Sequence, residues 1–159
     1  MKTLRSTVAA VLALGLASAL LASNETNKLE STPQVKAYRA LLAAMRAGDY
    51  AAYKRWMVKE AGARMDETNR QLGKDPKDVL TFMAVITPPE IAVTDLEVDG
   101  PRAILHANGK LEGEMNYGTV ELSREDGQWR VGLQSWTNKA AAPSLVARAR
   151  PAGEPRRTS

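Results

Sequence analysis

The chain has 159 residues, no cysteine and a formal net charge of +4 at pH 7. The absence of cysteine excludes disulfides, a lipid-modified cysteine anchor and thiolate chemistry. Most of the excess positive charge lies near the two ends, because residues 24–139 carry 16 Lys and Arg against 17 Asp and Glu. A near-neutral domain has no electrostatic attraction for a polyanion, so we expect no nucleic-acid partner.

Residues 1–22 have the pattern of a secretory signal peptide. Lys2 and Arg5 precede a run of small and apolar residues from 8 to 22. This run is shorter than the roughly 20 apolar residues of a membrane span, and Ala17-Ser18-Ala19 has the small-x-small form of a cleavage site. We therefore expect cleavage between residues 19 and 23, no membrane span, and a mature protein in a bacterial periplasm or in the medium.

Residues 24–139 are long enough for one domain, and its first half has a helical period. Pro33 predicts the start of a first helix, and Gly48 its end. Asp49 after that glycine is expected to cap a second helix, which Gly62 ends. A short third helix is predicted over 65–72. A fourth begins at residues 75–76, and helical spacing places four apolar side chains on one of its faces: Val79, Phe82, Met83 and Ile86.

The period then changes to the alternation of β-strands. Thr87-Pro88-Pro89 ends the helical region, because proline lacks a backbone donor. Four strands are expected over 91–98, 102–108, 115–123 and 128–137, with a bulge at Thr94-Asp95. Short connections between them predict an antiparallel meander. Residues 140–159 are rich in Ala, Pro, Arg, Gly and Ser, which is typical of a disordered basic tail.

Several segments between residues 33 and 138 carry a resemblance to a known family. These are Ala47-Gly48-Asp49-Tyr50, Asp99-Gly100-Pro101-Arg102-Ala103, Tyr117-Gly118-Thr119-Val120-Glu121-Leu122, Glu125-Asp126-Gly127-Gln128-Trp129-Arg130-Val131 and Gln134-Ser135-Trp136. The chain resembles the nuclear transport factor 2-like superfamily, in particular exported members of uncharacterised function. The resemblance implies a cystatin-like α+β cone, in which N-terminal helices pack on a curved four-stranded antiparallel meander.

The same resemblance implies a pocket in the cone, and pairing of two copies through the outer sheet face as one arrangement. The superfamily includes isomerase-like and dehydratase-like enzymes, SnoaL-type cyclases and many proteins without known catalysis. Its motifs in this chain are turns and packing positions, so no catalytic residue is transferred. A fold of this kind does not by itself determine a function.

His106 is the only histidine and the one weak catalytic candidate. An imidazole suits proton transfer but needs an orienting partner, and a hydrogen-bonded or exposed strand histidine is the simpler interpretation. Aromatic residues at helical spacing are candidates to line an apolar pocket or to pack in the core. The predicted pocket-lining residues are Tyr50, Tyr53, Trp56, Phe82 and Tyr117. With one histidine and no cysteine, we expect no metal site and no cofactor.

Three functions remain open on this basis. The leading hypothesis is an exported, non-catalytic binding module of the cell envelope, with a small apolar ligand or an envelope protein as its partner. The second is a cofactor-free isomerase or dehydratase that uses the cone pocket. The third is an envelope accessory protein whose basic tail contacts anionic lipid or polymer.

Overall fold

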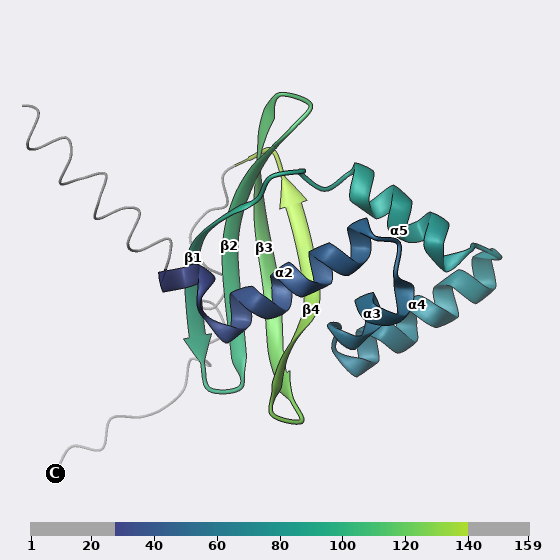
Figure 1. The fold of residues 1–159 in the computed structure, drawn as a ribbon, viewed down its shortest axis with the longest axis horizontal. Helices are drawn as coiled ribbons and strands as arrows, with labels where there is room; N and C mark the ends of the chain where they lie inside the picture. The colour runs from purple at the N-terminus through teal and green to yellow at the C-terminus, as the bar shows by residue number, and fades with distance from the viewer. Residues whose placement is uncertain (1–27, 140–159) are drawn as a thin grey trace, which may run out of the picture.

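The computed structural model describes residues 28–139, which form an antiparallel sheet and a layer of helices (Figure 1). The strands are β1 (Ala92–Asp99), β2 (Arg102–Leu111), β3 (Glu114–Glu125) and β4 (Gln128–Thr137). They lie side by side in chain order, each antiparallel to the next. The predicted α+β class and four-stranded meander are therefore confirmed. The predicted signal peptide and basic tail lie outside the described residues.

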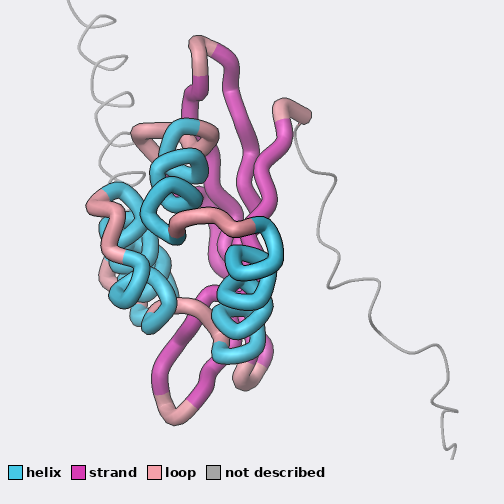
Figure 2. Tube along the Cα trace, turned by 90° about the vertical axis from the view of Figure 1, so that its right-hand side faces the viewer, coloured by secondary structure: helices cyan, strands magenta, loops and turns pink. Residues whose placement is uncertain are grey.

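In the described part of the chain, the sheet is preceded by α2 (Pro33–Arg46), α3 (Tyr50–Arg55), α4 (Lys59–Leu72) and α5 (Pro76–Val85). Helix α2 packs on the sheet, whereas α5 packs on α2 and α3. Seen from the side in Figure 2, the strand hairpins extend beyond the helices at both ends. The helices therefore cover the middle of the sheet and leave its ends open.

The predicted helix boundaries around residues 32–49 are confirmed. The hydroxyl of Thr32 accepts a hydrogen bond from the amide of Val35, with Pro33 in the first turn of α2. Gly48 adopts a positive φ of 66°, which glycine reaches without steric cost. Asp49 then accepts a hydrogen bond of 2.9 Å from the amide of Ala52 and caps α3.

The predicted break at Gly62 is wrong. Helix α3 already ends at Arg55, and α4 runs through Gly62 without interruption. The chain leaves the helix because Met57 forms a parallel bridge with Val131 of β4. Backbone hydrogen bonds to the edge of the sheet therefore replace the helical ones at this point.

Strands β2 and β3 are longer than expected. The predicted connection over 109–114 is a tight turn, in which Glu112 and Gly113 both have positive φ angles of 53° and 86°. Such a two-residue turn matches the twist of the strands it joins. The strands therefore extend to Leu111 and from Glu114, well beyond the helical layer.

Two bulges set which side chains face the helices. The first lies between Val93 and Asp95, as predicted. The second lies in β4, where the partners of Glu121 and Leu122 are Leu133 and Val131. Side chains of a regular strand alternate between its two faces, so Trp129 and Trp136, seven positions apart, would face opposite sides. The extra residue at the second bulge reverses this alternation, and both tryptophans pack against the core.

The core lies between α2 and the concave face of the sheet. Its largest fully buried side chains are Tyr38, Leu41, Met45, Leu80, Leu105, Leu122, Val35, Val120 and Pro88. The apolar face of α5 is only partly covered. Phe82 is 64% exposed and Ile86 is 49% exposed, whereas Leu80 is fully buried. The reason is that α5 packs mainly on the helices α2 and α3.

Candidate functional site

The interior of the cone, where the resemblance implies a pocket, is packed with side chains in the described part of the chain. Leu105 and Val120 on the sheet are 0% exposed, and so is Tyr38 of α2 that lies in the same core cluster. Removal from water raises the pKa of the Tyr38 hydroxyl well above its usual value, because the phenolate is poorly solvated there. The interior is therefore an apolar core of the kind that stabilises a fold.

The segment that precedes β1 covers one end of this core. Pro88 is buried, and its carbonyl accepts a hydrogen bond of 3.1 Å from Arg46 of α2. It lies directly on Gly109 of β2, where an added Cβ atom would be 2.6 Å from Pro88 and 2.4 Å from the carbonyl oxygen of Glu90. Glycine at position 109 thus allows the segment to close over the strand.

Two of the five predicted pocket residues belong to this packing. Tyr53 is 3% exposed and is a member of the core cluster. Its burial raises the pKa of its hydroxyl to about 12. Trp56 is half-buried and packs against the same cluster. Their positions agree with the core-packing alternative for aromatic residues at helical spacing.

The other three point elsewhere. The hydroxyl of Tyr50 donates a hydrogen bond of 2.8 Å to Asp66 of α4 and accepts one of 3.2 Å from Asn69. Partial burial, followed by the hydrogen bond to Asp66, raises the pKa of Tyr50 to about 12. Phe82 lies exposed on α5, and Tyr117 pairs with the outward-facing Asn108 on the sheet face opposite the helices. No shared pocket brings these five residues together.

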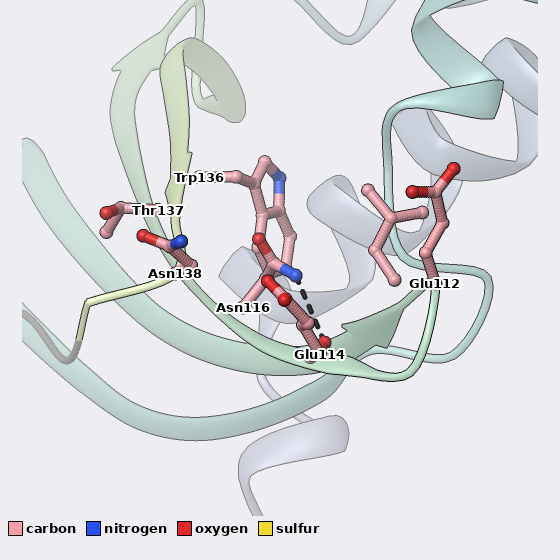
Figure 3. A pocket seen from close by; sticks show the side chains of 7 residues that line it. Glu112, Glu114, Asn116, Trp136, Thr137 and Asn138 are labelled. Carbon is pink, nitrogen blue, oxygen red and sulfur yellow. Dashed lines mark hydrogen bonds between the residues drawn. The ribbon is translucent and has the colours of Figure 1, made fainter.

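A hollow of about 520 Å³ lies instead at one end of the sheet (Figure 3). It is open and mostly polar, and Figure 3 shows the indole of Trp136 between Glu112 and the end of β4. Its lining residues are Leu111, Glu112, Glu114, Asn116, Trp136, Thr137 and Asn138. Carboxylate, amide and hydroxyl groups could contact a polar molecule here. The sequence signal for this hollow is the tight turn at Glu112-Gly113, which brings the end of β2 back to β3.

His106 lies on the outer face of the sheet, away from the core. Its neighbours Leu105 and Ala107 point to the helices, whereas its own side chain remains 24% exposed. It lies 3.2 Å from a carboxylate oxygen of Glu97, and Asp95 lies directly opposite it on β1. The orienting carboxylate that sequence reasoning did not find is therefore present. Counting outward from the Gly100-Pro101 turn could have placed Asp95 opposite His106, because positions 95 and 106 are equally distant from that turn, and Glu97 lies two positions along the same strand.

Helix α5 presents an apolar surface to solvent. Phe82, Val85 and Ile86 are 64%, 69% and 49% exposed. They are three and four positions apart, so they share one face of the helix. We call these three residues the α5 apolar face. No helix in the described part of the chain is long and apolar enough to cross a membrane.

Comparisons with known proteins found two solved structures that resemble the chain. No family model matches the chain, and no curated protein matches it. An NTF-2-like protein of unknown function from Silicibacter pomeroyi is 18% identical, with 70% of this chain and 98% of the other aligned and a TM-score of 0.45. Another from Burkholderia xenovorans is 16% identical, with 74% and 92% aligned and a TM-score of 0.42.

Proposed function

We propose that this protein is an exported, non-catalytic binding module of the bacterial cell envelope that holds a protein partner on the α5 apolar face. The observation that carries the proposal is the exposure of Phe82, Val85 and Ile86, each about half or more accessible to solvent. Contiguous exposed apolar side chains on a folded domain are typical of interaction sites. The signal-peptide pattern of residues 1–22 supports the envelope as the compartment.

The shape and the rim of this face favour a protein over other partners. A helix face is convex, so it fits a groove on another protein and cannot enclose a small molecule. Lys77 and Asp78 are exposed on the same helix, which gives a rim of both charge signs. A rim of this kind is typical of protein interfaces, whereas a membrane-binding helix carries mostly basic residues beside its apolar face.

The other functions have less support from the described residues. A small apolar ligand would need an interior cavity, and the core side chains occupy that space. An isomerase or dehydratase would need an acid–base group facing the pocket, and His106 faces the opposite side of the sheet. The accessory function of the basic tail concerns residues outside the described range.

Site-specific photo-crosslinking in intact cells tests the proposal. We would place a photoreactive amino acid at Val85, and at Glu121 on the outer sheet face as the matched control. We expect one discrete protein adduct from position 85 and none from position 121. The purified partner should then bind the wild-type chain and the Glu121→Gln variant with equal affinity. Its affinity for the Phe82→Ser variant should be lower by at least about tenfold.

Three results would contradict the proposal. One is the absence of an adduct at position 85, and another is equal affinity of Phe82→Ser for the purified partner. The third is a dimer of the pure chain that Phe82→Ser dissociates, because the face would then bind a second copy. Export is tested separately by cell fractionation with N-terminal sequencing, and full-length protein found only in the cytoplasm would contradict it.

A further inference from the structure

We propose that Asp95, Glu97 and His106 form a binding site for a zinc ion on the outer face of the sheet. The three residues lie on the strands β1 and β2, whereas the α5 apolar face lies on a helix. One ligand atom from each lies within 4.8 Å of the others. An imidazole nitrogen with two carboxylate oxygens is a donor set that zinc accepts, with a fourth position left for water.

The bulge in β1 creates this arrangement. Val93 faces the core, so strict alternation would turn Asp95 and Glu97 toward the core as well. The extra residue, Thr94, reverses the parity and places both carboxylates on the face that carries His106. Its hydroxyl donates a hydrogen bond of 3.1 Å to the carbonyl of His106, which holds the bulge against β2 at this position.

The distances suit one ion with only small side-chain movements. Two ligand atoms that are each about 2.1 Å from a tetrahedral zinc ion lie about 3.4 Å apart. Nε2 of His106 and Oε1 of Glu97 are 3.2 Å apart, close to that separation. Asp95 must approach the other two, and rotation of its side chain allows this because the residue is exposed.

The surroundings favour a cation. The direct cross-strand neighbour of Glu97 is Ile104, and that of His106 on β3 is Thr119. Both of these neighbours are uncharged. One oxygen of Asp95 accepts a hydrogen bond of 2.8 Å from the amide of Leu96, which steadies the carboxylate and leaves its second oxygen to ligate.

The experiment is a titration of tag-free protein with zinc, because a polyhistidine tag would itself bind the metal. We expect calorimetry to show one ion per chain with a dissociation constant below about 100 μM. His106→Gln and Asp95→Asn should each weaken binding at least about tenfold. Glu121→Gln, a change of another carboxylate on the outer sheet face, should leave binding unchanged.

A nuclear magnetic resonance measurement makes the test specific. His106 is the only histidine, so its imidazole nitrogen signals are assigned without ambiguity. Zinc should shift the Nε2 signal, and calcium at the same concentration should not, because calcium prefers oxygen ligands. Absence of zinc binding, an unshifted Nε2 signal at saturating zinc, or unchanged affinity in His106→Gln would each overturn the proposal. The pair would then be a hydrogen bond within the sheet only.

Discussion

The amide of Val58 donates a hydrogen bond of 2.8 Å to the carbonyl of Val131, and the amide of Val131 donates one of 2.7 Å to the carbonyl of Trp56. These two bonds join the connection between α3 and α4 to β4, which is an edge strand of the sheet. They give hydrogen-bond partners to the backbone groups of Trp56 and Val58, which lie where the helix is interrupted. They also give partners to the backbone groups of Val131, which would otherwise be exposed at the edge of the sheet.

Val58→Pro should lower the free energy of unfolding by about 1–2 kcal/mol, measured by urea denaturation. Val58 has a φ of −59°, so proline fits the backbone and the main loss is the hydrogen bond to Val131. Val58→Ala keeps the amide and serves as the control for the lost side chain. If both variants lost the same amount, the hydrogen bond would have no measurable role.

Gly109→Ala should destabilise the domain by about 2–3 kcal/mol, because its Cβ would meet the carbonyl oxygen of Glu90 at 2.4 Å. The matched control is Gly132→Ala, whose nearest neighbours would be 3.7 Å away or more. Thermal and urea unfolding of both variants measures the difference. A Gly109→Ala protein as stable as Gly132→Ala would show that segment 87–90 does not press on β2 as described.

Tyr53 should make the fold less stable in alkali. Burial raises its pKa from 10.0 to about 12, so the folded state holds the proton more tightly than the unfolded state. This contribution is fully present below pH 10, and it is lost as the pH rises through the folded-state value. We expect the free energy of unfolding of the wild type to fall more steeply between pH 9 and 11.5 than that of Tyr53→Phe. Parallel curves for the two proteins would contradict the prediction.

Phe82→Ser should change the free energy of unfolding by less than about 0.5 kcal/mol, because the ring is 64% exposed. Leu80→Ala, two positions earlier on α5, should cost about 2–5 kcal/mol, since Leu80 is fully buried. Urea denaturation measures both. A loss of more than about 2 kcal/mol in Phe82→Ser would mean that the ring supports the fold, and the variant could no longer test partner binding.

Much of the fold follows from local sequence patterns. Turn residues and alternation predicted the four strands and the bulge near Thr94, because these features depend on neighbours in the chain. Gly48 and Asp49 likewise predicted the junction of α2 and α3. The end of α3 was missed, since it depends on Val131, which is more than seventy residues away.

The candidate sites were less accessible to sequence reasoning. Helical spacing correctly placed Phe82 and Ile86 on one side of α5, but periodicity does not say whether another element covers that side. His106 was singled out from the sequence, whereas its carboxylate neighbours required the register between β1 and β2. A shift of one residue in that register would have moved Asp95 and Glu97 to the other face.

The sequence by itself determined the order of helices and strands, the near-neutral charge of residues 24–139 and the prediction of export. These properties depend on composition and on residues close together in the chain. Only the tertiary structure decided that the cone interior is filled, that the α5 apolar face is exposed and that Asp95, Glu97 and His106 converge. Each of these depends on which surfaces pack together, and contacts between distant segments set that packing.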